Sequence, residues 1–214
     1  MLASGPWAPE AIDVRWLTEP YEPDPAVAAA ADEALAGLAA RGSPSHDSMA
    51  ARLAGVSAEC GRLELELQPV RWSLRLVEGS AGESLFVHCL VRDRAGRWLA
   101  GRRSPWLAVL PGSWHLGAAG SVAARADPVA TIRQELDEEW GLAAERLTLA
   151  ALLGELSGRT VLLATAAVLD GAAPRPNHEH DDWSWWPADV AAWPAEATPE
   201  LRATAAFADT LVRR

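Results

Sequence analysis

The stretch that decides the fold runs from Gly120 to Leu142 and reads GSVAARADPVATIRQELDEEWGL. In its second half, Glu135, Glu138 and Glu139 stand at positions i, i+3 and i+4. Successive residues of an α-helix turn by about 100°, so these carboxylates lie next to each other on one side of a helix. Neighbouring like charges destabilise a helix, unless a hard divalent cation lies among their oxygens. The spacing therefore predicts a cation site on a helix.

The residues around the carboxylates predict a helix from Asp127 to Trp140. Asp127 is a good N-cap, Pro128 suits the first helical position, and Gly141 fits the position after the last turn. One side of this helix would be anchored in a core while the acidic edge holds a metal. A solvated acidic face is the alternative interpretation of the same carboxylates. The apolar stripe consists of Val129, Ile132, Leu136 and Trp140.

The whole stretch resembles the Nudix box, whose pattern is G, five residues, E, seven residues, and R-E-U-x-E-E-x-G-U, where U is apolar. Two positions depart from the pattern: Ala126 stands in place of its first Glu, and Gln134 in place of its Arg. These two family residues commonly interact, so the chain lacks the pair rather than one partner of it. Asp127 and Arg133 are not substitutes, because a shift of one residue turns a side chain by about 100° around a helix. The matching positions are Gly120, Glu135, Leu136, Glu138, Glu139, Gly141 and Leu142.

Segments on both sides of the box extend the resemblance from about Ser84 to the C-terminus. The run PGSWHLGAAG at Pro111–Gly120 is similar to the family's approach to the box. The run EHDDWSWWP at Glu179–Pro187 is similar to the acidic loop and Trp-bearing strand that follow the box in many members. The other expected elements are strands at Ser84–Asp93, Arg97–Arg103, Leu147–Leu156 and Arg159–Leu169, turns at Ala95-Gly96 and Ser157-Gly158, and helices at Pro187–Ala192 and Pro199–Arg213.

The resemblance implies an α/β fold, the Nudix α/β/α sandwich with a mixed sheet, over residues 83–214. Residues 1–82 are expected to add a small N-terminal α/β extension that caps it. Asp24-Pro25 and Gly42 delimit a helix at Ala26–Ala40, and a second short helix is expected at Ser48–Ala54. Alternating apolar residues predict two half-buried strands, at Leu63–Leu67 and Val70–Leu76. Their pairing is left open, because the intervening Gln-Pro is not a favoured hairpin turn.

Composition limits the classes of function. The formal net charge is −10 and all 19 basic residues are Arg, which argues against sequence-independent nucleic-acid binding. No signal-like segment or bilayer-long apolar span occurs, so we expect a cytoplasmic protein with no membrane partner. Cys60 and Cys89 make no disulfide framework, and Cys89 is expected to be a buried thiol. The family resemblance implies a small-molecule diphosphate as partner, and a homodimer is left open.

The resemblance also implies a chemistry. Its expected reaction is hydrolysis of a nucleoside diphosphate linked to another moiety, by attack of water on phosphorus. Mg²⁺, or Mn²⁺ as the alternative, would neutralise the diphosphate oxygens and lower the pKa of bound water. By the same resemblance, the metal ligands are Glu135, Glu138, Glu139 and the backbone carbonyl of Ala119.

The same three glutamates and Glu179 form the expected catalytic set. Glu135 or a loop carboxylate is able to act as the base. Glu179 is the first loop candidate for the base or a further metal contact, followed by Asp127, His180 and the rest of Glu179–Asp182. A solvated loop is the alternative interpretation of this acidic segment.

Candidates for substrate binding flank the expected site. Arg102 and Arg103 close a strand, and a guanidinium fork binds two phosphate oxygens at once, although Arg on an edge strand is often only solvated. Trp114 is the candidate for stacking on a base or sugar. Trp72 and Trp140 are expected to fill core volume instead.

Three functions are compatible with these residues. A diphosphate hydrolase comes first. An enzyme similar to isopentenyl diphosphate isomerase comes second, but that reaction requires a cysteine near the box, where Ala118, Ala119 and Ser121 stand. A non-catalytic ligand-sensing Nudix module comes third, and the retained metal glutamates argue against it.

Overall fold

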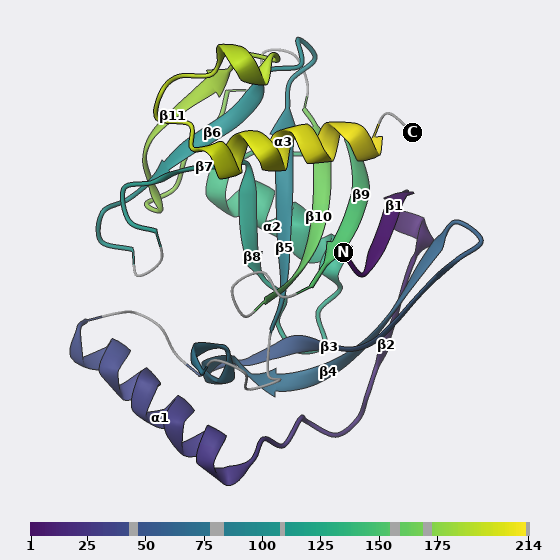
Figure 1. The fold of residues 1–214 in the computed structure, drawn as a ribbon, viewed down its shortest axis with the longest axis vertical. Helices are drawn as coiled ribbons and strands as arrows, with labels where there is room; N and C mark the ends of the chain where they lie inside the picture. The colour runs from purple at the N-terminus through teal and green to yellow at the C-terminus, as the bar shows by residue number, and fades with distance from the viewer. Residues whose placement is uncertain (43–46, 78–83, 108–109, 155–158, 169–172, 213–214) are drawn as a thin grey trace.

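The computed structural model describes residues 1–42, 47–77, 84–107, 110–154, 159–168 and 173–212. A mixed β-sheet lies between two helices, and further strands and a third helix lie at one end of the molecule (Figure 1). This arrangement confirms the expected α/β/α sandwich. The helix over the near face of the sheet in Figure 1 contains the C-terminal end of the described chain.

Strand β5 (Ser84–Arg92) lies in the middle of the sheet. It pairs in parallel with β10 (Arg159–Ala167) and antiparallel with β8 (Ala118–Ser121). Strand β9 (Arg146–Leu153) pairs antiparallel with β10, and β1 (Ala3–Trp7) pairs antiparallel with β9. The extreme N-terminal strand therefore joins the sheet of the box-containing part, although the sequence predicted no strand there.

A second group of strands continues from β5. Strand β6 (Trp98–Arg103) pairs antiparallel with β7 (Trp114–Leu116) on one edge and with β11 (His180–Trp186) on the other. It joins β5 through the pair Arg92 and Trp98. These three strands carry several of the candidate site residues.

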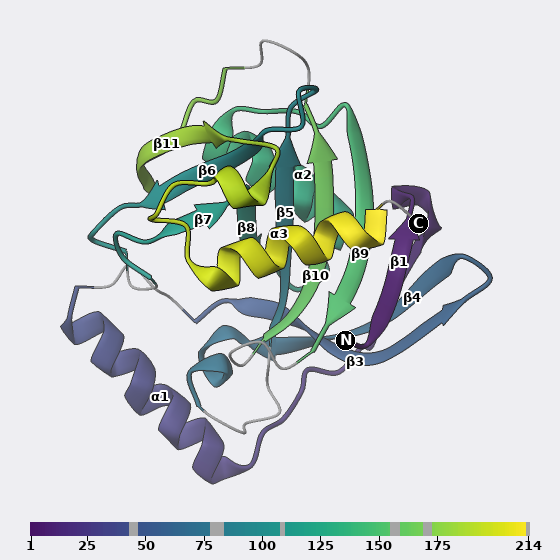
Figure 2. The ribbon, with the colours of Figure 1, turned by 45° about the horizontal axis from the view of Figure 1, so that its top comes forward.

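Helices α2 (Pro128–Trp140) and α3 (Pro199–Val212) cover opposite faces of the sheet (Figure 1, Figure 2). The α2 helix begins and ends as predicted. The Asp127 carboxylate accepts the backbone N–H of Ala130 at 2.8 Å, and Gly141 follows with a φ of 60°. Local sequence signals were sufficient to predict both ends of α2, because each capping residue acts on the backbone of the helix itself.

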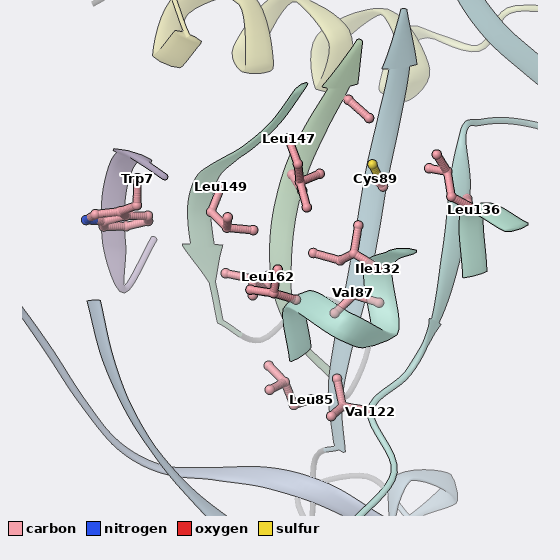
Figure 3. Close-up of a cluster of buried hydrophobic side chains, with 14 of the residues drawn as sticks. Trp7, Leu85, Val87, Cys89, Val122, Ile132, Leu136, Leu147, Leu149 and Leu162 are labelled. Carbon is pink, nitrogen blue, oxygen red and sulfur yellow. The ribbon is translucent and has the colours of Figure 1, made fainter. Parts of the chain in front are cut away.

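Each face of the sheet has its own core. On the α2 side, Ile132 and Leu136 pack with Val87, Cys89 and other buried residues of the sheet (Figure 3). On the α3 side, buried residues of α3 pack with residues of β6, β7 and β11; these include Trp98, Ala100, Leu116, Trp186, Ala205, Ala208 and Leu211. Cys89 is the buried thiol that the sequence predicted. The side chains that point to α2 and those that point to α3 alternate along β6, as a pleated strand requires.

The N-terminal part contains helix α1 (Pro25–Ala40) and three further strands. Strand β4 (Arg62–Arg71) pairs antiparallel with β3 (Met49–Glu59) and in parallel with β2 (Ile12–Trp16). The Asp24 carboxylate accepts the backbone N–H of Ala26 at 2.8 Å, so α1 begins where the sequence predicted. A division of the chain at residues 82 and 83 stays a prediction.

Two N-terminal predictions were wrong. Residues 48–54 form no helix: from Met49 onward they belong to β3, because pairing with β4 outweighs a weak local preference. Residues Val70–Leu76 also do not form the separate second strand that was expected. Strand β4 runs through Pro69 to Arg71, and a 3₁₀ helix, η2 (Trp72–Leu76), follows. The backbone N–H of Ser73 donates to the Asp47 carboxylate at 2.9 Å, which supports this change of direction.

The expected C-terminal elements differ in length from those observed. The segment 187–192 contains only a 3₁₀ helix, η3 (Val190–Ala192), whose start is capped by the Asp189 carboxylate. The Ser157-Gly158 turn and the expected ends at Leu156, Leu169 and Arg213 lie outside the described residues. Within the described ranges, no helix is long and apolar enough to cross a membrane.

Candidate metal and phosphate site

The three box carboxylates of α2 have three different environments. Glu138 is exposed, and its carboxylate accepts the Nε2–H of Gln134 at 2.7 Å. Glu135 is half-buried, whereas Glu139 is only 3% exposed. The carboxylates therefore extend from solvent into the space between α2 and the sheet.

Strand β8 supplies the backbone against which two of these carboxylates pack. The Oε1 atom of Glu139 accepts the backbone N–H of Ala119 at 2.9 Å. The Glu135 carboxylate lies against the α-carbon of Gly120 so closely that a Cβ atom on that residue would overlap it. The first glycine of the box is thus required by close approach of a side chain, and Ala119 lies directly beside Glu139.

Electrostatic interaction links the helix carboxylates with Glu179. Burial, as the largest cause, and the charges of Glu138 and Glu179 together raise the pKa of Glu135 to about 7. Burial, as the largest cause, raises the pKa of Glu139, and the charges of Glu135 and Glu179 also raise it; against the opposing hydrogen bond from Ala119, the result is a pKa of about 8. The negative charges of neighbouring carboxylates, Glu179 among them, therefore disfavour the ionised forms of Glu135 and Glu139.

These residues fit a divalent cation. The Oε2 atom of Glu139 is buried and has no hydrogen-bond partner among the described residues. A buried carboxylate oxygen without a donor is unfavourable, and a cation would satisfy it. Carboxylate and backbone carbonyl oxygens are the ligands that Mg²⁺ and Mn²⁺ prefer. The candidate ligands are the carboxylates of Glu135, Glu138 and Glu139 and the carbonyl of Ala119.

Arg103 lies beside this cluster on the α2 side of β6. Its Nη1 atom is 3.7 Å from Oε2 of Glu179, and its positive charge lowers the pKa of Glu139. Residues 103, 101 and 99 of β6 share one face of the strand, and Leu99 packs in the core on the α2 side. The structure therefore brings Arg103 and Glu179 to the helix carboxylates.

Arg102 and Trp114 point to the other face of the sheet. Arg102 pairs through Nε with the Asp181 carboxylate at 2.7 Å, and Asp182 lies 3.7 Å from its Nη2 atom. The Trp114 ring packs 5.3 Å from the ring of Trp186, in the core on the α3 side. The structure does not bring these two candidates to the carboxylates.

Asp127 also lies away from the cluster, because it caps the opposite end of α2. Twelve positions separate it from Glu139, which corresponds to about 18 Å along a helix. Trp140 fills core volume as predicted: it is fully buried, and its Nε1–H donates to the Gly117 carbonyl at 2.9 Å. Trp72 is half-buried against the small N-terminal core.

Two histidines lie beside Glu139, and one of them was not expected there. The Nε2 atom of His180 is 3.7 Å from Oε2 of Glu139 and 2.5 Å from Nε2 of His115. Burial lowers the pKa of both imidazoles, that of His180 to about 4. The sequence analysis did not identify His115. Its neighbours Trp114 and Leu116 on β7 belong to the core on the α3 side, so alternation along the strand directs His115 to the α2 side.

The one thiol near the cluster among the described residues is that of Cys89. It lies on β5, opposite Ala118 of β8, and is buried. Burial, together with the charge of Glu139, raises its pKa above the usual range for a thiol. A protonated and enclosed thiol is poorly suited to proton transfer with a substrate, which argues against the isomerase alternative.

Replacing Gly120 by Ala is expected to weaken Mg²⁺ binding by about tenfold or more, because the new Cβ displaces the Glu135 carboxylate. Overpacking of this kind also costs about 1–3 kcal/mol of unfolding free energy. Isothermal titration calorimetry with Mg²⁺ and thermal denaturation measure the two effects. The matched control is Gly37→Ala in α1, where a Cβ meets only an Arg41 nitrogen at 3.7 Å. Unchanged Mg²⁺ affinity in Gly120→Ala would exclude Glu135 as a ligand.

Comparison with known proteins adds independent information. The NUDIX domain family model matches residues 85–206, which is more than half of the chain and includes the whole box. Among curated proteins, none matches.

Solved structures with the same fold include the NUDIX domain of Shewanella oneidensis NrtR, cocrystallised with ADP ribose. It is 18% identical, the TM-score is 0.50, and the match covers 61% of this chain and 88% of that one. The MutT NUDIX hydrolase from Burkholderia pseudomallei is 21% identical, with a TM-score of 0.47 and coverage of 58% and 97%. A C. elegans Ap4A hydrolase is 16% identical, with a TM-score of 0.47 and coverage of 61% and 98%. At identities this low, the likeness is one of fold alone.

Proposed function

Because this chain belongs to the NUDIX family, we propose that it is a Mg²⁺-dependent hydrolase that cleaves the diphosphate linkage of a nucleoside diphosphate-type substrate. Membership of the family supports an enzyme of the pyrophosphohydrolase type. The observation that carries the proposal is the cluster of four interacting carboxylates with one buried, unpartnered oxygen.

In this proposal, the carboxylates of Glu135, Glu138 and Glu139 and the carbonyl of Ala119 hold Mg²⁺. Bound Mg²⁺ supplies charge neutralisation at the diphosphate and acidifies a bound water. Mn²⁺ is the alternative ion, because it accepts the same oxygen ligands. Glu138 faces solvent and is the ligand most accessible to an incoming ion.

Arg103 and Glu179 have complementary roles in the reaction. The Arg103 guanidinium, only 3.7 Å from Glu179, binds a phosphate oxygen and orients the diphosphate. Glu179, and Glu135 as the second candidate, accepts the proton from the attacking water. The water oxygen forms a new bond to phosphorus, the bridging P–O bond breaks, and the bridging oxygen leaves with the second phosphate. Arg102 and Trp114 remain candidates for substrate binding only if part of the substrate extends to the α3 side of β6.

We expect a substrate screen to identify cleavage that requires added Mg²⁺ and stops in excess chelator. The compounds are ADP ribose, nucleoside diphosphate sugars, dinucleotide polyphosphates and nucleoside triphosphates. Phosphate-containing products are measured by chromatography, and reaction in ¹⁸O-labelled water identifies which phosphorus is attacked. If a diphosphate binds tightly but no compound is cleaved with Mg²⁺ or Mn²⁺, the ligand-sensing alternative replaces the hydrolase.

A further inference from the structure

We propose a second metal site, for Zn²⁺ or another transition-metal ion, formed by Nε2 of His115, Nε2 of His180 and Oε2 of Glu139. The three ligand atoms come from β7, β11 and α2 and all lie within 4.8 Å of one another. Two imidazoles and one carboxylate form a donor set that catalytic zinc sites use, with a further position left for water or a ligand. The site differs from the proposed Mg²⁺ site in two of its three ligands.

The two imidazoles meet in an orientation that suits a shared ion. Their ring planes are 7° apart and their centres 4.8 Å apart, whereas the Nε2 atoms are only 2.5 Å apart. The rings are therefore coplanar and meet head to head, with both Nε2 atoms in the space between them. Zinc binds nitrogen and oxygen ligands at about 2.0–2.2 Å in a tetrahedral arrangement, so binding requires the two rings to pivot and their Nε2 atoms to move apart.

Two of the buried side-chain atoms that lack a hydrogen-bond partner in the described structure belong to this group. They are Oε2 of Glu139 and Nδ1 of His180. The Oε2 atom is directed at the His180 imidazole, 3.7 Å away, on a side chain that is 3% exposed. A cation between the two would satisfy the carboxylate oxygen.

The His180 ring is held in place by its surroundings. It packs against the Trp140 ring, with centroids 4.3 Å apart. Gly101 lies against the same two side chains, and a Cβ on Gly101 would overlap both rings. A ligand that is fixed before the metal arrives loses little conformational entropy on binding.

Imidazole ligands determine which ion this site prefers. Mg²⁺ selects oxygen ligands, whereas imidazole nitrogen suits Zn²⁺ and its neighbours in the transition series. Both proposed sites use the Glu139 carboxylate. Zn²⁺ bound at the histidine site therefore withdraws Glu139 from Mg²⁺ and inhibits turnover; this inhibition rests on the proposed function.

Direct binding of Zn²⁺ to the full-length protein tests the site without any substrate. We expect one Zn²⁺ per chain to bind in the presence of millimolar Mg²⁺, measured by competition with a chromophoric chelator. His115→Gln and His180→Gln are each expected to weaken Zn²⁺ binding by at least about tenfold, since even outer-shell changes cost about 10- to 100-fold. The matched control is His178→Gln, which removes an exposed histidine that stacks on Trp106 and is expected to leave the affinity unchanged.

Two results would overturn the site. One is absence of Zn²⁺ binding at micromolar concentration in the wild-type protein. The other is unchanged affinity in both His115→Gln and His180→Gln. If either variant fails to fold, Co²⁺-loaded wild-type protein decides: paramagnetically shifted signals from two imidazole rings are expected, and their absence refutes the proposal. Because these measurements need no turnover, Zn²⁺ binding without hydrolysis would refute the proposed function and leave the site intact.

Discussion

Glu138→Gln and Glu139→Gln are each expected to reduce Mg²⁺-dependent turnover by about a hundredfold or more. Changes that only touch the partners of metal ligands already cost about 10- to 100-fold, so loss of a ligand's own charge costs at least as much. Gln keeps the size of Glu but offers a neutral amide, which binds a hard cation much less strongly.

The effect on stability is expected to have the opposite sign for Glu139. Burial raises the pKa of Glu139 to about 8, so the folded protein disfavours its ionised form. A Gln at this position still accepts the Ala119 N–H and needs no proton to stay neutral, so the melting temperature of the metal-free protein rises at pH values above the ordinary pKa of a glutamate. Glu138 is exposed, and its replacement is expected to change the melting temperature little.

Steady-state kinetics at saturating Mg²⁺ and thermal denaturation without metal measure the two effects. Asp137→Asn is the matched control, because it removes an exposed carboxylate from the same helix but not from the cluster. Undiminished turnover in both Gln variants would mean that the catalytic metal is bound by other residues.

Restoring the pair that the box lacks is expected to raise kcat. In the double variant Ala126→Glu with Gln134→Arg, an Arg replaces the Gln134 amide, which now donates to the Glu138 carboxylate at 2.7 Å. The new ion pair would fix the loop before α2 and orient Glu135. Poor orientation of a catalytic group costs about a hundredfold, so a gain of up to that size is expected.

The two single variants show whether the effect on kcat requires both new residues or only one of them. Ala126 is half-buried and packs against the core on the α2 side, so Glu alone at this position places an unpaired charge near apolar groups. Ala126→Glu alone is therefore expected to lower the melting temperature, and Gln134→Arg alone to leave kcat near the parent value. The substrate found in the screen serves for all four proteins. A double variant that is no faster than the parent would show that the missing pair does not limit the rate.

Local sequence signals were sufficient to predict the helices and strands whose ends depend on residues within or next to the element itself. Helices α1 and α2 begin at Asp-Pro pairs whose carboxylates cap the first turn, and both beginnings were predicted. Strands β5 and β6 were also predicted from local signals, because strand-like runs flank the turn at Ala95-Gly96. Of these elements, α2, β5 and β6 lie in the part of the chain that carries the family resemblance.

Elements that depend on a distant partner were not predictable in the same way. Strands β1 and β2 consist of five residues each, in a Pro-rich segment, and they form by pairing with β9 and β4. Strand β3 was mistaken for a helix at its start, and its strand conformation depends on β4. The energy of such pairing comes from cross-strand contacts, which short-range patterns do not contain.

The sequence by itself determined which carboxylates share one side of α2, because helical geometry places positions i, i+3 and i+4 together. Only the tertiary structure decided that Glu138 faces solvent while Glu139 is buried, since that difference depends on how β8 packs against the helix.

The same distinction holds for His180, which regular alternation would place on the same side of β11 as Trp186. A register shift between His180 and Asp182 adds one residue to β11 and turns His180 to the α2 side, toward Glu139. Such a bulge arises from how β11 is fitted against β6, and no local pattern of residues specifies it.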